Sequence, residues 1–253
     1  MRIVGVIPSR WGSTRFPGKS LAPICGRPLV LWVVEAVRRA ECLDEVIVAT
    51  DDERIAEVVE GCGCGVSVVM TPPELPSGTD RVAVAAKPDD DDIVINIQGD
   101  EPLIEPSLIE ALALRLKSES GFKMATAASP ITSLQDLESR SIVKVVCDAE
   151  GGALYFSRLP IPCRRDGAPD FESGLYWRHL GIYAYRGEFL KRLVQEPPCS
   201  LERCESLEQL RALYIGGRIA VLQTNHVGVG VDNPEDVAHV EELMRRSGVC
   251  GAE

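Results

Sequence analysis

Several common functional signatures are missing from this sequence of 253 residues. No apolar run reaches the length of a membrane span, and no charged leader with an apolar signal region precedes the first predicted strand. We therefore expect a cytoplasmic protein with no membrane partner. Basic residues are outnumbered by acidic ones, 27 against 38, and the net charge of -11 argues against a general surface for nucleic acid. Any anion must then be bound by a local basic pocket.

Zinc and disulfide patterns are also missing, although the chain has nine cysteines. No two of them form a C-x-x-C pair, and their spacing follows no zinc motif. The closest pair, Cys62 and Cys64, lies in a glycine-rich turn between a predicted helix and a predicted strand. We expect most cysteines to be reduced and buried as small apolar residues, and we expect neither metal nor redox chemistry at this pair.

The loop at residues 8–19, PSRWGSTRFPGK, directly follows the apolar run at residues 3–7. Its cations Arg10, Arg15 and Lys19 stand among glycines and hydroxyl side chains, so charges and backbone N–H groups can converge on phosphate oxygens. The loop matches neither G-x-x-x-x-G-K-[ST] nor G-x-G-x-x-G. Taken alone, it is either a site for a nucleoside triphosphate or a basic surface loop after a strand.

Strand and helix patterns alternate through the first half of the chain. Strands are predicted from apolar runs at residues 3–7, 45–49, 66–70, 93–97 and 124–128, and helices at residues 28–39, 53–60 and 106–117. This alternation predicts an α/β fold with a doubly wound, Rossmann-like, mostly parallel sheet. Ligands of such sheets lie off the carboxyl ends of the strands.

The alternation changes after about residue 130. Antiparallel strands are predicted at residues 143–147 and 153–157, a proline- and charge-rich loop at 160–172, a further strand at 178–185 and a helix at 201–213. The length is common for one α/β domain. We therefore predict a single domain over residues 1–253, with a smaller antiparallel subdomain inserted at about residues 130–220.

Two aspartates occupy positions where the predicted sheet would present them. Asp100 follows the strand at residues 93–97 and can hold Mg²⁺ against triphosphate oxygens, although a turn aspartate before a proline is common without any ligand. Asp232 ends a glycine-rich stretch, and an aspartate followed by Asn-Pro-Glu-Asp is equally a good helix start. Position alone leaves both alternatives open for each residue.

Polar residues in the second half of the chain are less distinctive. His179 and Tyr183 fall on one face of their predicted strand because side chains alternate with period two. They can line a polar pocket or serve as hydrogen-bonded structure. Glu208 and Gln209 lie beside an apolar helical stripe, and the pattern alone places them in solvent.

A series of sequence blocks resembles the family of 3-deoxy-manno-octulosonate cytidylyltransferases, which make CMP-Kdo for lipopolysaccharide. The blocks follow the family order and span almost the whole chain, although the first is shared with other sugar nucleotidyltransferases, including CMP-sialate synthetases. Ser9 stands where the family usually has alanine, and Trp11 takes an aromatic position. The blocks are IPSR and STRFPGK (7–19), VATDD (48–52), SGTDR (77–81), QGDEP (98–102), LYFSR (154–158), RHLGIY (178–183), LEQLR (207–211) and GVD (230–232).

The resemblance implies roles for individual residues. Arg10 and Lys19 would contact the β and γ phosphates of CTP and stabilise the departing pyrophosphate, with Ser13 and Arg15 nearby. The segment from Ser77 to Arg81 would close on the cytosine. Asp100 and Asp232 match the carboxylates that hold Mg²⁺ as the cofactor. The implied sugar pocket consists of Gln98, His179, Tyr183, Glu208 and Gln209, with Arg158 as a partner for the sugar carboxylate.

The resemblance also implies a nucleotide-diphospho-sugar transferase fold, a homodimer and a reaction. The anomeric hydroxyl of 3-deoxy-D-manno-octulosonate (Kdo) would attack the α-phosphorus of CTP, with pyrophosphate leaving. No general base is evident in the sequence, so positioning and metal-assisted charge stabilisation would be the main catalytic factors.

Two alternatives remain open. One is a cytidylyltransferase for an amino-substituted octulosonate or a sialic acid, because one exchanged substituent changes only a few pocket contacts. The other is a non-catalytic regulatory protein that binds CTP. The presence of Asp100, Asp232 and Lys19 together argues against a mere sensor, which would not need both metal carboxylates.

Overall fold

A computed structural model describes residues 1–12 and 15–250 of the chain. These residues form two compact units, the first made of residues 1–110 and 228–253 and the second of residues 111–227. The first boundary falls within helix α4 (Pro106–Ser118), which had been expected at residues 106–117. The predicted insertion at about residues 130–220 lies inside the second unit, which begins earlier and ends later.

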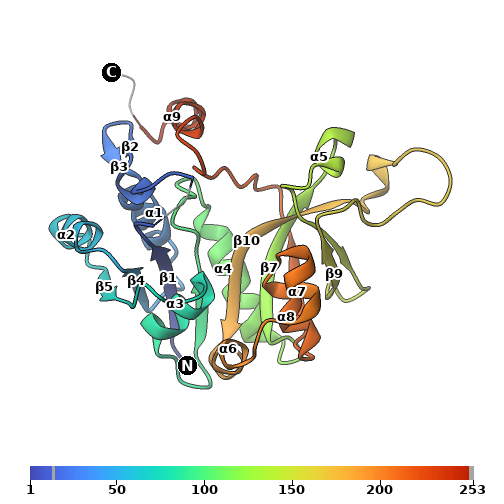
Figure 1. Cartoon of the computed structure of the whole chain (residues 1–253), viewed down its shortest axis with the longest axis horizontal. Helices are drawn as coiled ribbons and strands as arrows, with labels where there is room; N and C mark the ends of the chain where they lie inside the picture. Colours follow the sequence, from blue (N-terminus) through green and yellow to red (C-terminus); the bar gives the residue numbers. More distant parts are fainter. Residues whose placement is uncertain (13–14, 251–253) are drawn as a thin grey trace. The chain divides into compact units, whose positions relative to one another are not determined.

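Four parallel strands form the sheet of the first unit, in the order β6–β1–β4–β5 (Figure 1). Their bounds are Ile3–Ser9 for β1, Glu45–Thr50 for β4, Ser67–Met70 for β5 and Ile93–Asn96 for β6. β1 and β6 are buried almost throughout, as near-continuous apolar runs predict for strands covered on both faces. Val6 pairs with both Ile47 and Asn96, so these strands end at a common edge.

The helices of the first unit begin at side-chain caps where the sequence offers them. Asp52 caps α2 (Glu53–Gly61) by accepting from the backbone N–H of Arg54 at 3.0 Å. Ser77 caps α3 (Gly78–Ala86), a helix that the sequence analysis did not predict. α1 (Leu29–Arg38) follows a short hairpin of β2 (Pro23–Ile24) and β3 (Arg27–Pro28), and the single turn η1 (Lys19–Leu21) precedes that hairpin.

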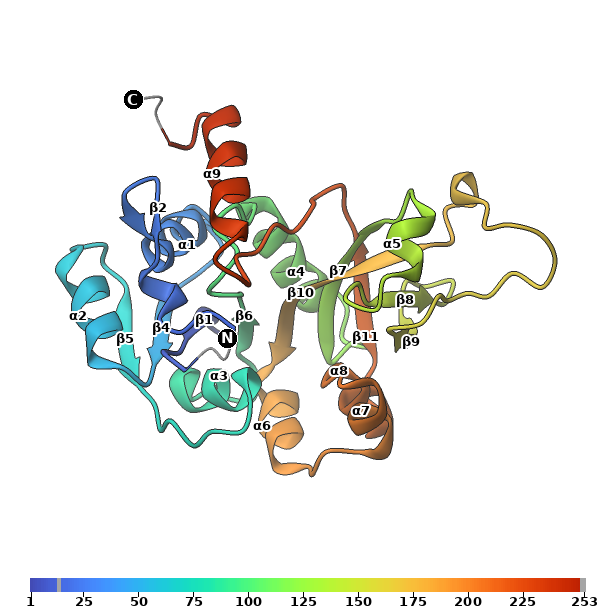
Figure 2. The ribbon, with the colours of Figure 1, turned by 45° about the horizontal axis from the view of Figure 1, so that its top comes forward.

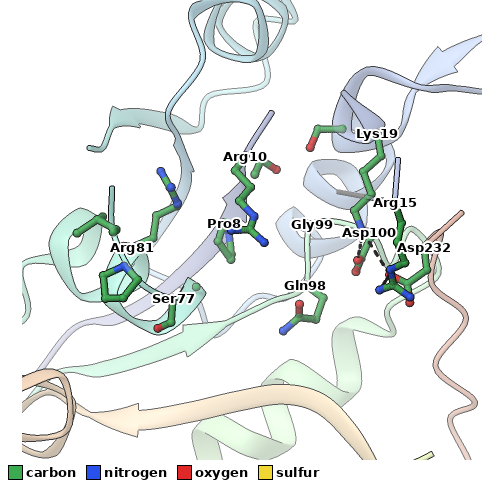
Figure 3. Close-up of a pocket in the computed structure, with 15 residues that line it drawn as sticks. Pro8, Arg10, Arg15, Lys19, Ser77, Arg81, Gln98, Gly99, Asp100 and Asp232 are labelled. Carbon is green, nitrogen blue, oxygen red and sulfur yellow. Dashed lines mark hydrogen bonds and ion pairs between the residues drawn. The ribbon is translucent and has the colours of Figure 1, made fainter. Parts of the chain in front are cut away.

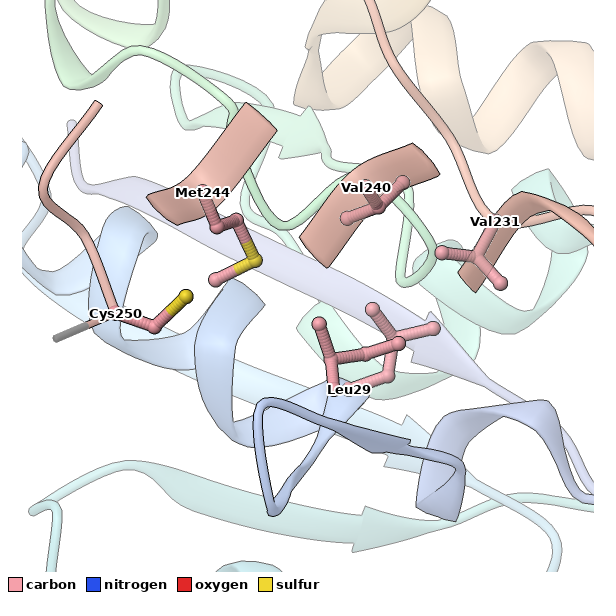
Figure 4. Close-up of a cluster of buried hydrophobic side chains, with 6 residues drawn as sticks. Leu29, Val231, Val240, Met244 and Cys250 are labelled. Atoms are coloured by element: carbon pink, nitrogen blue, oxygen red, sulfur yellow. The ribbon is translucent and has the colours of Figure 1, made fainter. Parts of the chain in front are cut away.

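The last helix, α9 (Asp236–Arg246), returns the chain to the first unit and lies beside the β2–β3 hairpin in both ribbon views (Figures 1 and 2). Val240 and Met244 of α9 are fully buried against Leu29 at the start of α1 (Figure 4). Val231 belongs to the same cluster. Burial of these side chains therefore fixes the segment that carries Asp232.

The cysteines differ from the prediction. Cys25 in the hairpin pairs with Cys250 after α9, and Cys62 pairs with Cys64. The return of α9 to the hairpin brings Cys25 and Cys250 together across 225 positions of sequence, which spacing rules cannot anticipate. Among the five free cysteines of the described chain, only Cys199 is buried. Five of the nine cysteines are thus free, but the prediction that most are buried is wrong. The disulfide between Cys62 and Cys64 also contradicts the expectation that this pair has no redox chemistry.

The second unit is built around strand β7 (Met124–Pro130). β11 (Ile219–Gln223) pairs with it in parallel, and β10 (Trp177–Arg186) pairs with it in the antiparallel direction. β8 (Lys144–Cys147) joins β10 and forms an antiparallel pair with β9 (Ala153–Ser157), which confirms the antiparallel strands expected from the sequence.

The helices of this unit are short. α5 (Leu134–Glu138) and α6 (Gly187–Gln195) follow β7 and β10. The single helix expected at residues 201–213 is wrong, because the chain forms α7 (Ser200–Glu205) and α8 (Gln209–Tyr214) instead. Ser206 separates them with a left-handed backbone, φ 53°, which an α-helix cannot continue through.

A wide loop between β9 and β10 extends away from the β8–β9 pair and contains the turn η2 (Phe171–Ser173) (Figure 2). In residues 1–12 and 15–250, no helix combines the length and apolar character that crossing a bilayer requires.

Candidate active site

A cavity of about 360 Å³ opens at the carboxyl edge of the first unit's sheet (Figure 3). Its volume is typical of sites for small ligands. Four basic side chains and two carboxylates line it, so the cavity is locally basic in a chain whose net charge is -11. The lining residues are Pro8, Ser9, Arg10, Arg15, Lys19, Ser20, Leu75, Pro76, Ser77, Gly78, Arg81, Gln98, Gly99, Asp100 and Asp232.

Neighbouring strand ends bring two of the predicted site segments together. β1 ends at Ser9 and is followed by Arg10, while β6 leads into Gln98 and Asp100. A Cβ atom on Gly99 would lie 2.7 Å from the carbonyl oxygen of Pro8 and 2.9 Å from the hydroxyl of Ser9. Glycine at this position therefore allows the close approach that places both segments on one cavity.

Lys19 lies between the two predicted metal carboxylates (Figure 3). Its Nζ forms an ion pair with Asp100, donates to the carbonyl oxygen of Val231 at 3.1 Å, and lies 3.5 Å from Oδ1 of Asp232. Arg15 donates to the same Asp232 oxygen at 2.9 Å. Asp100 and Asp232, which are far apart in the sequence, thus converge on one cation.

Burial sets the electrostatics of this cluster. Removal of Asp100 from solvent raises the pKa of its carboxyl group, and the adjacent Lys19 ammonium opposes that rise. Without a nearby cation, the Asp100 carboxylate would be disfavoured in this place. The cluster therefore depends on a positive charge, supplied here by lysine.

Asp232 does not cap the helix that follows it. The carboxylate of Asp236 accepts from the backbone N–H groups of Asp232 and Asn233, both at 2.8 Å. The backbone N–H groups of the turn before α9 are thereby paired with Asp236 and not with the side chain of Asp232. The side chain of Asp232 is left to face Lys19 and Arg15, which supports the ligand alternative over the helix-start alternative.

Ser77 and Arg81 line the opposite side of the cavity (Figure 3). The hydroxyl of Ser77 accepts from the backbone of Asp80 at 3.2 Å and donates to its carboxylate at 2.6 Å. Arg81 is buried and pairs with Asp51 at 3.0 Å. The sequence analysis missed Asp51, although it lies in the quoted VATDD block directly after β4.

His179 and Tyr183 lie on one face of β10, as predicted, with ring centroids 5.3 Å apart. Burial lowers the pKa of His179 to about 3 and raises that of Tyr183, so both rings are neutral near pH 7. The hydroxyl of Thr126, a residue that sequence reasoning missed, shares a 3.0 Å hydrogen bond with Nε2 of His179.

The Thr126 hydroxyl also indicates the tautomer of His179. Its oxygen lies 2.7 Å from the carbonyl oxygen of Ile182 and 3.2 Å from that of Leu180, where the β7–β10 register shifts. A hydroxyl has one proton, which it donates to a carbonyl because a carbonyl only accepts. The imidazole Nε2 is then the protonated nitrogen and Nδ1 the acceptor.

The remaining sugar-pocket candidates differ in their surroundings. Arg158 donates to the carbonyl oxygens of Glu205 at 2.7 Å, Arg140 at 3.0 Å and Ser206 at 3.2 Å. The predicted contact of Arg158 with a sugar carboxylate stays a prediction. These three hydrogen bonds do not favour it.

Glu208 immediately precedes α8 and pairs with Arg211 at 3.4 Å, whereas Gln209 is only 4% exposed. The pattern-based placement of Gln209 in solvent is wrong. Ser13, predicted beside the phosphates, lies outside the described residues.

Comparison with known proteins identifies the class. The cytidylyltransferase family model matches residues 4–219, and the chain belongs to this class of nucleotidyltransferases. A solved structure described as CMP:2-keto-3-deoxy-manno-octonic acid synthetase complexed with CTP matches with a TM-score of 0.89 and 40% identity, covering 98% of this chain and 100% of the other. A 4-diphosphocytidyl-2C-methyl-D-erythritol synthase from Anaerococcus prevotii, 12% identical with a TM-score of 0.63, shares the fold.

Curated relatives narrow the family. The 3-deoxy-manno-octulosonate cytidylyltransferase of Bdellovibrio bacteriovorus is 49% identical over 98% of this chain and all of its own length. The enzyme of the same name from Geobacter sulfurreducens is 47% identical over 97% of this chain and all of its own length. The chain belongs to the 3-deoxy-manno-octulosonate cytidylyltransferase family.

Proposed function

We propose that this chain transfers CMP from CTP to the anomeric hydroxyl of Kdo, giving CMP-Kdo for lipopolysaccharide synthesis and releasing pyrophosphate. Full-length identity of 49% to an enzyme of that name supports the activity. The observation that carries the assignment of residues is the convergence of Asp100 and Asp232 on Lys19, inside a basic cavity at the carboxyl edge of a parallel sheet.

The phosphate loop supplies the charges for the triphosphate. Arg10 and Lys19 contact the β and γ phosphates, and Arg15 lies nearby. These cations stabilise the negative charge that develops on pyrophosphate as the α-phosphorus is attacked. Ser77 and Arg81 line the side of the cavity that receives the cytosine.

The donor set suits Mg²⁺ as the cofactor. Asp100 and Asp232 provide hard carboxylate oxygens around one point, where an ammonium nitrogen now lies, and such ligands are those that Mg²⁺ prefers. When bound, Mg²⁺ would screen the triphosphate and lower the pKa of the attacking hydroxyl. Lys19 and Arg15, which neutralise the carboxylates here, would transfer to phosphate oxygens as CTP and metal enter.

Kdo contacts are assigned to Gln98, His179, Tyr183, Glu208 and Gln209. Because the pKa of His179 is about 3, its ring is a poor acceptor for the hydroxyl proton and instead orients the sugar through hydrogen bonds. Positioning, rather than a general base, then carries this part of the reaction.

A homodimer completes the proposed function. Leu154, Leu159 and Leu175 of β9 and the following loop are each more than half exposed, at 61%, 54% and 56%. Exposed apolar side chains on β9 and the following loop suit contact with a second copy of the chain. Sedimentation equilibrium would report the mass of the dimer, and a monomer at micromolar concentration would contradict it.

Substitution of the two carboxylates tests the proposed metal site. Asp100→Asn keeps the size but removes the charge, so we expect turnover to fall about 100-fold or more, partly restored by raised Mg²⁺. The double variant Asp100→Asn, Asp232→Asn should be little worse than the poorer single variant, because residues acting as one unit are not additive. The exposed Asp91→Asn serves as the matched control.

Pyrophosphate release, measured with CTP and a panel of sugar acids, provides the readout. Preference for Kdo over amino-Kdo and sialic acid is the expected result. Independent, multiplicative losses in the folded double variant would contradict a shared metal site. CTP binding without turnover on any sugar acid would instead favour a regulatory protein.

A further inference from the structure

We propose that Asp51 is a positioning residue for triphosphate binding, because it anchors the backbone from which the phosphate loop presents Arg10 and Lys19. This inference rests on the proposed placement of the triphosphate over that loop. Asp51 does not line the cavity and belongs to neither the proposed metal site nor the proposed sugar pocket.

Asp51 directly follows β4 and joins two segments through its two carboxylate oxygens. Oδ1 accepts from the backbone N–H of Trp11 at 3.1 Å, and Oδ2 accepts from Arg81 at 3.0 Å. The side chains of Asp51 and Arg81 are only 11% and 3% exposed. A pair this buried holds its geometry, since solvent cannot replace either partner without cost.

Arg81 is also held by Thr71. Its other terminal nitrogen donates to the hydroxyl of Thr71, and that hydroxyl donates to the carbonyl oxygen of Thr50 at 3.0 Å. Thr50 ends β4 and Thr71 directly follows β5, and the backbone N–H of Thr71 also donates to the carbonyl oxygen of Thr50 at 2.8 Å. The Asp51 carboxylate is thereby tied to the edge of the sheet. The backbone at Trp11, which bonds to Asp51, is thereby attached to the sheet.

The backbone of Trp11 also bonds to the other end of the loop. Its carbonyl oxygen accepts from the backbone N–H of Gly18 at 3.0 Å. Gly18 has a φ of 70°, and a Cβ atom there would lie 2.8 Å from the Trp11 ring. Because Arg10 precedes Trp11 and Lys19 follows Gly18, this one bond ties together the positions of both phosphate cations.

The Trp11 ring adds a second attachment to the same loop. The guanidinium of Arg54 lies 3.3 Å from the ring centroid, a cation–π contact. Asp52 holds Arg54 through bonds of 2.8 and 2.7 Å. The residues directly after β4 thus hold Trp11 by its backbone and by its ring, so the position of Trp11 is fixed before any ligand arrives.

Fixed positions of Arg10 and Lys19 favour a ligand that contacts both side chains. A preformed loop removes part of the entropy cost of binding, but only for a ligand that contacts Arg10 and Lys19. CTP makes those contacts through its β and γ phosphates, whereas CMP has neither phosphate. Loss of the Asp51 anchor should therefore weaken CTP more than CMP.

Calorimetric titration of CTP and CMP into the full-length protein tests this difference. We expect Asp51→Asn to lower the preference for CTP over CMP about tenfold, the loss typical of a hydrogen bond to a charged group, and to weaken CMP less than CTP. KM for CTP should rise correspondingly, with a smaller change in kcat. Lys19→Ala should also lower the preference, because it removes a proposed phosphate contact.

Asp92→Asn is the matched control. Asp92 is likewise buried, accepts from the backbone N–H of Arg2 at 2.6 Å and pairs with the Arg2 side chain at 2.9 Å. It lies at the amino end of the same sheet, so its loss should reduce stability without changing nucleotide preference. Asp44→Asn, which loses a 2.7 Å bond from the backbone of Ile3, replaces it if Asp92→Asn does not fold.

The outcomes separate this proposal from the placement of the triphosphate. If Lys19→Ala lowers the preference for CTP and Asp51→Asn does not, the positioning role is overturned while the triphosphate site stands. Equal weakening of CTP and CMP by Asp51→Asn assigns Asp51 a purely structural role and also overturns the proposal. If Lys19→Ala keeps the full preference, the loop does not hold the triphosphate and both proposals fail.

Gly18→Ala provides a second variant in case Asp51→Asn does not fold. An added methyl group would displace the Trp11 ring while the Asp51–Arg81 pair stays intact. We expect the same selective loss of CTP affinity from this change. An unchanged preference for CTP in Gly18→Ala would overturn the role of the Trp11–Gly18 contact.

Discussion

At the scale of the residue, the present partners of a charged side chain decide whether that side chain can bind a substrate. Lys19 and Arg15 neutralise two carboxylates inside a cavity, where an incoming anion and metal can take over both partners. Arg158 instead donates to three backbone carbonyls. Breaking those bonds would leave carbonyls without partners, which costs free energy. Arg15 can therefore exchange its partner for a ligand, whereas Arg158 is held by the fold.

Ser9 gives a prediction at this scale. Its hydroxyl is buried and has no hydrogen-bond partner among the described residues, so Ser9→Ala should raise the free energy of unfolding by about 1 kcal/mol. Urea denaturation without nucleotide measures the change. Ser157→Ala is the matched control, because that buried hydroxyl donates to Glu205 at 2.8 Å and its removal should destabilise. Equal losses in both variants would contradict the prediction.

At the scale of the element, α9 connects packing to the proposed metal site. Its apolar side chains are buried against α1 and the β2–β3 hairpin, and Val231 in the same cluster immediately precedes Asp232. The position of a carboxylate is thus set by apolar contacts one residue away. A helix with weak packing here would leave the carboxylate poorly placed.

Met244→Ala tests this connection. The side chain is fully buried, so its truncation should cost about 2–5 kcal/mol through lost transfer free energy and a cavity. Met70→Ala, at a methionine that is 50% exposed, should change stability by less than about 0.5 kcal/mol. Chemical denaturation followed by circular dichroism compares the two. Similar effects at both methionines would show that α9 is not anchored by this cluster.

At the scale of the whole molecule, the chain divides its chemistry between two units. All described residues assigned to CTP and the metal belong to residues 1–110 and 228–253. Of the residues assigned to Kdo, Gln98 also belongs to this first unit, whereas His179, Tyr183, Glu208 and Gln209 belong to residues 111–227. Substitutions in the two units should therefore affect the two substrates differently.

Gln209→Ala tests that division. Gln209 is buried, and its loss should raise KM for Kdo about tenfold or more, as expected when a polar partner of a substrate is removed, with KM for CTP within about twofold. Tyr214→Ala, at an exposed position of the same helix, is the control. Initial rates at saturating levels of each substrate in turn give both constants. A defect on CTP would show that the assignment of the second unit to the sugar is wrong.

Local sequence patterns predicted the four parallel strands of the first unit with α1, α2 and α4, but not α3, α5, α6 or β11. They left the roles of the candidate residues open, and those roles came from the resemblance to the family. Apolar runs predicted the buried strands of the first unit, and the sequence analysis placed the loop at residues 8–19 and Asp100 at the carboxyl ends of these strands, where the cavity lies. These features depend on residues close in sequence, or on motifs whose chemistry requires particular side chains. Backbone preferences and charge are properties that each residue carries into any fold.

Only the tertiary structure decided what distant residues do to one another. It paired Cys25 with Cys250, buried Gln209, and joined Asp51 to Arg81 and Trp11. Each of these depends on a partner from another segment, and no local pattern records that partner. Burial and pairing arise when elements pack, so they follow from the sequence as a whole and cannot be assigned from any one stretch of it.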